Sequence, residues 1–184
     1  MRVISGSAKG RNLKSVPGDT TRPITDRVKE AVFNILSADV IDARFLDLFG
    51  GTGAVGIEAL SRGAESVLFA DDHKAALTAI EKNIKACSLE NRTNTIKWNI
   101  FNNLNIIRLY RPAFNLVFLD PPYNKNMIQS TLSNLNMSRC LANGSRLALE
   151  HSLLEPIPET LPEFKISDQR RYGKTLVSFL IYMV

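Results

Sequence analysis

The stretch Phe45–Arg62 reads FLDLFGGTGAVGIEALSR, and it decides the fold. Its first five residues, 45–49, form an apolar run with one acid and predict a strand that opens directly into a glycine-rich turn. Counted from Gly51, the glycines have the G-x-G-x-x-G spacing between this strand and a helix over 53–62. This context is typical of nucleotide-binding folds, because glycines allow a tight turn and a close approach of the backbone to a ligand. The same turn also occurs where a strand and a helix only pack together.

The rest of the chain repeats this alternation of strand and helix. Apolar runs predict strands near 44–49, 66–71, 94–98, 115–120, 145–150 and 175–183, with helices near 53–62, 73–87 and 126–141. Such alternation predicts an α/β fold in which helices cover both faces of a parallel sheet. The length of 184 residues and the apolar content of 45% predict a single domain over 1–184. We divide this domain into a basic N-terminal arm over 1–24, β-rich or extended, and a core over 25–184.

A further helix is expected at the start of this core, over 26–38. Thr25 can cap this helix, and Asp26 in the first turn suits the positive end of the helix dipole. Its apolar residues recur at helical spacing and therefore share one face. They are Val28, Ala31, Val32, Ile35 and Leu36.

Acidic residues stand at the ends of three predicted strands: Asp47, Asp71 and Asp120. In an open α/β sheet the ligand binds in the crevice at the carboxyl ends of the strands, where an acid such as Asp71 can hold ribose hydroxyls. The glycine turn carries neither lysine nor arginine, which disfavours a phosphate-cradling loop. A crevice lined by carboxylates favours a ligand with a ribose and a positive charge. S-adenosylmethionine fits this description better than a nicotinamide dinucleotide with its anionic pyrophosphate.

The second informative motif is Asp120-Pro121-Pro122-Tyr123, at the end of the apolar run 116–119. Neither proline has an N–H group, so this turn offers carboxylate and carbonyl oxygens but few donors. Such a turn suits an exocyclic amine, which has two hydrogens to donate, while Tyr123 provides a flat face on which a base can stack. Taken alone, the motif also fits an ordinary proline turn after a strand.

The net charge of +5 is concentrated at the two ends of the chain. Residues 1–36 hold seven basic and three acidic residues, and residues 165–184 hold four basic and one acidic. The intervening 37–164 hold twelve basic and fourteen acidic residues. Basic ends around a nearly neutral core indicate contacts with nucleic-acid phosphates, although any single lysine is more simply explained as a solvated surface residue.

Other sequence features point to a cytoplasmic protein. The two cysteines, Cys87 and Cys140, form no CxxC motif and are expected to be reduced thiols. His73 and His151 are too isolated to predict a metal site, and we expect no metal. The N-terminal residues do not resemble a signal sequence, and no apolar run approaches the length needed to span a membrane.

Taken together, these motifs resemble those of the bacterial 16S ribosomal RNA guanine-N2 methyltransferases, a family of Rossmann-like, S-adenosylmethionine-dependent methyltransferases. The resemblance runs nearly end to end, and its most specific part is the segment Arg-Pro-x-Thr-Asp-Arg at 22–27. The other matching segments are 6–11, 28–31, 46–53, 57–64, 119–123, 150–152 and 171–175.

The resemblance implies a seven-stranded sheet whose last strand runs antiparallel, and methylation of a guanine N2 amine in an assembled or assembling small ribosomal subunit. A monomer is our default expectation. Three groups of site residues are expected. The catalytic residues are Asp120, Pro121, Pro122 and Tyr123. The cofactor-binding residues are Asp47, Phe49, Gly50, Gly51, Gly53, Gly56, Asp71, Asp72, Asn99, Ile100 and Asp120. The RNA-binding residues are Arg2, Lys9, Arg11, Thr25, Arg22, Arg27, Arg170, Arg171 and Lys174.

The chain departs from the family pattern at a few positions. Gly51 stands where the family usually has alanine, and Asn99 replaces the acid near the adenine. An amide oxygen at Asn99 can still accept a hydrogen bond from the adenine amino group. Asn115 replaces another acid, and Asp71-Asp72-His73 replaces a Glu-x-Asp pattern. None of these changes removes a predicted catalytic group.

Two alternatives remain open at the level of sequence. Asp-Pro-Pro-Tyr also occurs in DNA adenine-N6 methyltransferases, although a separate target-recognition domain is not evident in a chain of this length. A glutamine-modifying protein methyltransferase is less favoured, since it more often has asparagine in place of Asp120. The other class is a nicotinamide-dependent oxidoreductase or a non-catalytic nucleotide-binding module, which would leave the proline turn and the basic ends unexplained.

Overall fold

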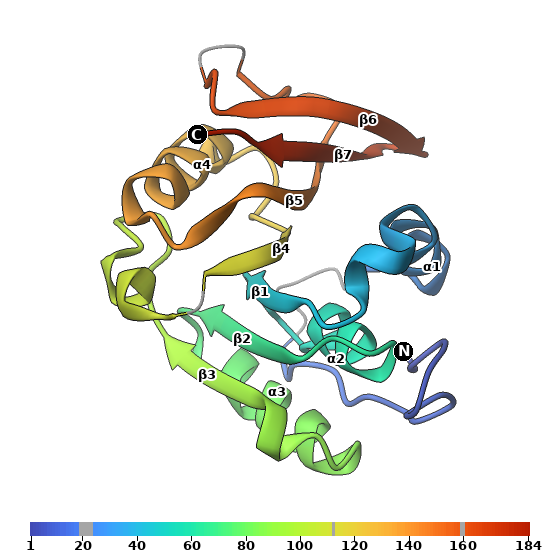
Figure 1. Ribbon diagram of the computed structural model, residues 1–184. Helices are drawn as coiled ribbons and strands as arrows, with labels where there is room; N and C mark the ends of the chain where they lie inside the picture. Colours follow the sequence, from blue (N-terminus) through green and yellow to red (C-terminus); the bar gives the residue numbers. More distant parts are fainter. Residues whose placement is uncertain (19–23, 112, 159–160) are drawn as a thin grey trace.

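A computed structural model describes residues 1–18, 24–111, 113–158 and 161–184 (Figure 1). It contains a seven-stranded sheet with the strand order β3-β2-β1-β4-β5-β7-β6. The strands are β1 (Arg44–Leu48), β2 (Ser66–Asp71), β3 (Thr93–Lys97), β4 (Phe114–Leu119), β5 (Leu141–Ser152), β6 (Phe164–Tyr172) and β7 (Thr175–Tyr182). The α-helices are α1 (Asp26–Leu36), α2 (Ala54–Ser61), α3 (Lys74–Ala86) and α4 (Met127–Ser138), with short 3-10 helices η1 (Ser37–Val40), η2 (Glu90–Arg92) and η3 (Asn105–Leu109).

The topology confirms the predicted Rossmann-like methyltransferase fold. Strands β1 to β5 pair in parallel, and β7 runs antiparallel to both of its neighbours, β5 and β6. The order reverses at β1, which pairs with β2 on one side and with β4 on the other. In open α/β sheets the ligand binds at such a reversal, which here lies at the carboxyl ends of β1 and β4.

One strand was not predicted from the sequence pattern, and another is several residues longer than predicted. The pattern did not predict β6, because this edge strand exposes most of its side chains and lacks the alternation of a half-buried strand. The strand expected near 145–150 is longer at both ends and spans Leu141–Ser152. Its early residues Asn143 and Gly144 are exposed and polar or small, so they carry no apolar signal.

Helices cover both faces of the sheet, as the alternation predicts (Figure 1). Helices α1, α2 and α3 pack on one face in a core cluster that includes Phe45 and Phe69. Helix α4 and η3 pack on the other face in a second cluster that includes Leu46 and Leu48. Successive residues of β1 therefore enter different cores, which explains why its sequence is apolar almost throughout. Among the described residues, we find no helix with the length and apolarity needed to cross a membrane.

Helix α1 is shorter than predicted, and it buries Val28, Val32 and Leu36 as predicted but differs at the other core positions. Thr25 caps it as expected, since its Oγ1 accepts a hydrogen bond from the Val28 amide at 3.3 Å. The helix ends at Leu36 and continues as η1, which accounts for the predicted extension to 38. Lys29 and Phe33 are fully buried, whereas the predicted core residues Ala31 and Ile35 are only half-buried. A buried lysine breaks the apolar pattern, and its partner lies on α2.

The N-terminal arm is folded back onto α2. Within residues 1–18 its β structure consists of one isolated antiparallel bridge, between Arg2 and Asn12. The Glu58 carboxylate on α2 accepts hydrogen bonds from the amides of Ile4 at 2.8 Å and Ser5 at 2.9 Å. A side chain on Gly6 would collide with the Ser61 carbonyl oxygen, 1.7 Å from the position of its Cβ. The described part of the arm is therefore packed closely against the core.

Candidate functional site

The glycine turn begins where β1 ends, and its backbone is left-handed at three positions. Phe49 has a φ of 62°, Gly51 a φ of 54° and Gly53 a φ of 75°. Helix α2 begins directly after this turn and packs against β2. At Gly56 a Cβ would lie 2.3 Å from the Phe69 ring, so only glycine allows this helix to approach the strand.

Asp47 holds the start of α2 in place. Its Oδ2 accepts a hydrogen bond from the Gly56 amide at 2.9 Å, in the first turn of the helix. The side chain is almost fully buried. Burial raises the pKa of the Asp47 carboxyl to about 8, and the nearby Asp71 charge adds to this rise, while the Gly56 hydrogen bond opposes it. Asp47 therefore retains its proton more readily than an ordinary aspartate.

Asp71, at the end of β2, organises the same turn from the other side. Its Oδ2 accepts a hydrogen bond from the Gly51 amide at 3.0 Å, and its Oδ1 accepts one from the His73 amide at 2.9 Å. The adjacent Asp72 is exposed and lies 2.6 Å from His73 Nδ1. The side-chain oxygen and nitrogen atoms of Asp71, Asp72 and His73 that could bind a metal lie within 4.8 Å of one another. His73 is therefore less isolated from other possible metal ligands than its sequence context indicated. Hydrogen bonding to two backbone amides accounts for the orientation of Asp71 without a metal ion.

The loop after β3 carries the predicted adenine-contacting residues. Asn99 is exposed, and its Oδ1 accepts a hydrogen bond from the Asn102 amide at 3.2 Å, whereas Ile100 is buried. The side chain of Asn134 on α4 anchors this loop by donating to the Ile100 carbonyl at 3.2 Å and to the Phe101 carbonyl at 3.0 Å. Asn134 was not predicted, because an asparagine within a helix has no characteristic sequence pattern.

The Asp-Pro-Pro-Tyr turn follows β4. The Tyr123 hydroxyl donates a hydrogen bond to Glu150 Oε1 at 2.9 Å and lies 3.4 Å from Thr175 Oγ1. Burial, more than the neighbouring acids, raises the pKa of the Tyr123 phenol, so the hydroxyl remains a donor. On the far side of the turn, the Asn124 amide donates to Glu155 Oε2 at 2.7 Å. Two glutamates from the β5 side thus hold the turn in position.

Asp120, Glu150 and Asp47 form a group of carboxyl groups around this turn. The pKa of Asp120 is raised well above that of an ordinary aspartate, first by burial and then by the negative charges of Glu150 and Asp47. The predicted acids Asp47, Asp71 and Asp120 are thus brought to one edge of the sheet. Glu150 was not among the predicted site residues, although it ends the predicted strand 145–150 just as the three aspartates end theirs. The same rule applied to that strand would have found it.

A cavity of about 250 Å³ adjoins the Tyr123–Glu150 hydrogen bond. The segments that line it are far apart in the sequence: the start of α1, the end of β5 and the turn between β6 and β7 (Figure 1). Its lining residues are Thr25, Arg27, Val28, Glu150, Arg171, Tyr172, Gly173 and Thr175. Three segments of the family resemblance, 22–27, 150–152 and 171–175, contribute to this cavity.

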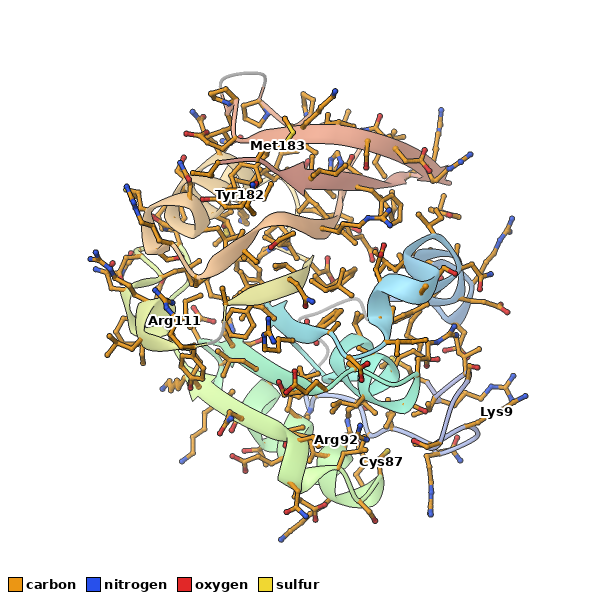
Figure 2. All side chains as sticks on the ribbon, viewed as in Figure 1. Lys9, Cys87, Arg92, Arg111, Tyr182 and Met183 are labelled. Atoms are coloured by element: carbon orange, nitrogen blue, oxygen red, sulfur yellow. The ribbon has the colours of Figure 1, made fainter. Side chains whose placement is uncertain are left out.

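The predicted RNA-binding residues within the described ranges are exposed. Arg27 and Arg171 border the cavity. Arg170 lies on β6, and Lys174 lies in the turn between β6 and β7. Lys9 points away from the fold at the tip of the N-terminal arm (Figure 2). The others are Thr25, which caps α1 and lines the cavity, Arg2, which lies 3.8 Å from the Asp26 carboxylate, and Arg11. Arg22 lies outside the described residues.

Comparison with known proteins identifies the family of this chain. The family described as "Conserved hypothetical protein 95" matches residues 1–181. The chain belongs to this family. It is 36% identical over 178 residues to "Putative rRNA methyltransferase YlbH" of Bacillus subtilis (strain 168), covering 97% of each chain. It is 28% identical to "Ribosomal RNA small subunit methyltransferase D" of Escherichia coli (strain K12), covering 99% of this chain and 89% of the relative.

A solved structure shows the same architecture over the whole chain. "Putative methyltransferase yhhF from Escherichia coli" superposes with a TM-score of 0.84 at 28% sequence identity. The match covers 100% of this chain and 98% of that one. This agreement extends through β6 and β7, which contribute part of the cavity.

Proposed function

We propose that this protein transfers a methyl group from S-adenosylmethionine to the exocyclic N2 amine of a guanine in 16S ribosomal RNA of the small subunit. One observation carries the proposal more than any other. The Tyr123–Glu150 hydrogen bond joins the Asp-Pro-Pro-Tyr turn, at the crevice of the sheet, to a cavity bordered by basic residues. This link supports a proposal in which the methyl donor binds on one side of the turn and the RNA base enters from the other. The names of the relatives, rRNA and small-subunit methyltransferases, support the RNA substrate.

The residues of the crevice fit S-adenosylmethionine by their chemistry. Asp71 offers carboxylate oxygens suited to ribose hydroxyls, and Asp47 and Asp120 offer negative charge to a cation. Asn99 and Ile100 lie at the edge expected to face the adenine. When bound, this molecule supplies an electrophilic methyl group on a positively charged sulfonium. The protein therefore has to align the acceptor amine, accept hydrogen bonds from it, and allow one proton to leave after transfer.

Asp120 is the residue proposed to act on the amine. A guanine N2 nitrogen is a poor nucleophile because its lone pair is delocalised into the ring. The Asp120 carboxylate and the Pro121 carbonyl would accept the two amino hydrogens and direct the lone pair away from the ring. Tyr123, fixed by Glu150, would hold the base plane, with Pro122 completing the turn. After transfer the amine proton would pass to Asp120 or to water.

The raised pKa values make cofactor affinity dependent on pH. Asp47 and Asp120 have raised pKa values, so they favour the protonated form at low pH and ionise as the pH rises. Ionisation strengthens binding of the cationic S-adenosylmethionine more than binding of the uncharged thioether of S-adenosylhomocysteine. We expect the ratio of the affinity for S-adenosylmethionine to the affinity for S-adenosylhomocysteine to rise about tenfold between about pH 6 and pH 8. Isothermal titration calorimetry measures the dissociation constants of both ligands. A ratio independent of pH would contradict the proposal that Asp47 and Asp120 contact the sulfonium.

The proposed reaction is tested by labelled methyl transfer to unmodified small-subunit RNA, offered both naked and as assembled subunits. Digestion to nucleosides then identifies the product. N2-methylguanosine is the expected nucleoside, and methylated adenosine would overturn the proposal. A melting shift with S-adenosylhomocysteine but not with a nicotinamide dinucleotide separates a methyltransferase from an oxidoreductase.

Replacing Arg22 and Arg27 together with alanine should weaken RNA binding without changing cofactor affinity. Arg27 is exposed at the border of the cavity, where a guanidinium can pair with a phosphate. We expect a higher KM for RNA and a salt dependence of log K whose slope is shallower by about 1 to 2. Fluorescence anisotropy across a salt series checks this, with calorimetry for the cofactor. A loss of cofactor affinity would mean that the segment covers the cofactor and does not grip RNA.

A further inference from the structure

The cavity beside the catalytic turn has two chemically different ends. Glu150 and Thr175 are buried, with 7% and 6% of their surface exposed, and form its inner end. Arg27 and Arg171 are exposed and form its outer end. A carboxylate and a hydroxyl at the inner end can read a neutral polar edge, while guanidinium groups outside suit a phosphate. This arrangement matches one nucleotide that enters base first.

The size of the cavity also fits a single base. Its volume of about 250 Å³ is smaller than that of a typical pocket for a drug-sized ligand, about 300–1,000 Å³. Enzymes that modify a base within a folded nucleic acid swing it out of its stack into a closely fitting pocket. The half-buried Tyr172 and Gly173 also line the cavity, and an aromatic side chain is a group on which a base can stack.

We propose that Glu150 selects guanine by accepting the N1–H of the target base, next to the amine that receives the methyl group. This inference rests on the proposed guanine-N2 activity. Glu150 Oε1 already accepts the Tyr123 hydroxyl at 2.9 Å, and a carboxylate can accept several hydrogen bonds at once. The same residue that orients Tyr123 would therefore also read the base edge.

The chemistry of the purine edge explains how such a contact discriminates. Guanine presents an N1–H donor beside its N2 amine, and a carboxylate accepts a hydrogen bond from this N1–H. Adenine presents a bare N1 lone pair at this position, which a carboxylate repels. Buried polar sites built for one hydrogen-bonding pattern reject a ligand lacking it, because the site is then left with an unsatisfied group. Arg27, Thr25 and Arg171 supply donors suited to the guanine O6 or to the adjoining phosphate.

The test replaces the mapped target guanine in the RNA with 2-aminopurine. This base keeps the C2 amine but has a lone pair at N1, so it remains a possible methyl acceptor without the N1–H. The wild-type protein should prefer guanine by at least about 100-fold in kcat/KM. In Glu150→Gln, whose amide can both accept and donate, the preference should fall below about tenfold. The missing O6 of 2-aminopurine affects both proteins alike, so the change in preference isolates the group that faces N1.

The matched control is Glu81→Gln, the same chemical change on the exposed surface of α3, which should keep the wild-type preference. Two results would overturn the inference while leaving the proposed function intact. One is a wild-type protein that forms N2-methylguanosine yet methylates the 2-aminopurine RNA equally well. This measurement uses the wild-type protein alone and does not depend on the folding of a variant. The other is a folded, cofactor-binding Glu150→Gln with an unchanged preference. A wild-type product other than N2-methylguanosine would instead overturn the proposed function itself.

Discussion

Replacing Asp120 with alanine is expected to lower kcat for methyl transfer by about 10²- to 10³-fold, the loss typical when one group that stabilises transition-state charge is removed. Cofactor affinity near neutral pH should stay within a few-fold of wild type. The reason is that S-adenosylhomocysteine, with which this affinity is measured, has an uncharged thioether and gains little from a charge on Asp120. Single-turnover kinetics and calorimetry with S-adenosylhomocysteine separate the two effects. Turnover that survives nearly intact would remove Asp120 from the proposed mechanism.

The isosteric change Asp120→Asn distinguishes catalytic loss from structural damage. An aspartate whose folded pKa is raised destabilises the fold progressively as the pH rises from its unfolded pKa toward its folded pKa. Asparagine has no such cost, so this variant should be more stable than wild type at about pH 8 and equal to it near pH 4. A gain of about 1 kcal/mol corresponds to a rise in Tm of about 2–4 °C. An inactive variant with a raised Tm indicates that stability is sacrificed at this position for function.

The fold was predictable because its signals are local. The run Phe45–Phe49, the glycine turn and the repeated apolar strands follow from short-range pattern, and the structure has strands or helices at each predicted place. The edge strand β6 was not predicted because a strand shows an alternating apolar pattern only when one of its faces is buried. Most side chains of β6 are exposed. Lys29 also broke its predicted pattern, since a buried ion pair cannot be inferred from one helix alone.

The site was predictable only in part, because it depends on contacts between distant segments. The acids at strand ends could be grouped by a topological rule, since parallel strands end at the same edge. The pairing of Tyr123 with Glu150 joins residues 27 positions apart, and the cavity joins α1 to the β6–β7 turn. Nothing in the local sequence of these segments specifies that they meet. Likewise, Glu155 holds the loop after β4 through one hydrogen bond and Asn134 holds the loop after β3 through two, and these contacts leave no pattern in the chain.

Glu58→Ala is expected to lower the free energy of unfolding by about 3–5 kcal/mol, the usual cost of removing one partner of a buried ion pair. Lys29 Nζ lies 3.3 Å from Glu58 Oε2, and both side chains are fully buried. Without Glu58, Lys29 keeps one described contact, a hydrogen bond to the Arg2 carbonyl, in surroundings that already lower its pKa through burial. A loss of this size corresponds to a fall in Tm of about 10 °C, measured by calorimetry.

The same substitution should release the N-terminal arm, because Glu58 also accepts the amides of Ile4 and Ser5. Hydrogen exchange should show these two amides losing protection well before the strands of the core do. Asp168→Asn is the matched control: it removes a carboxylate from an ion pair with Arg170 at 3.0 Å that is largely exposed, and it should cost less than about 1 kcal/mol. Equal losses in the two variants would mean that the buried pair does not anchor the arm. A selective loss that also weakens RNA binding would instead show that α2 holds Lys9 and Arg11 where they can reach the RNA.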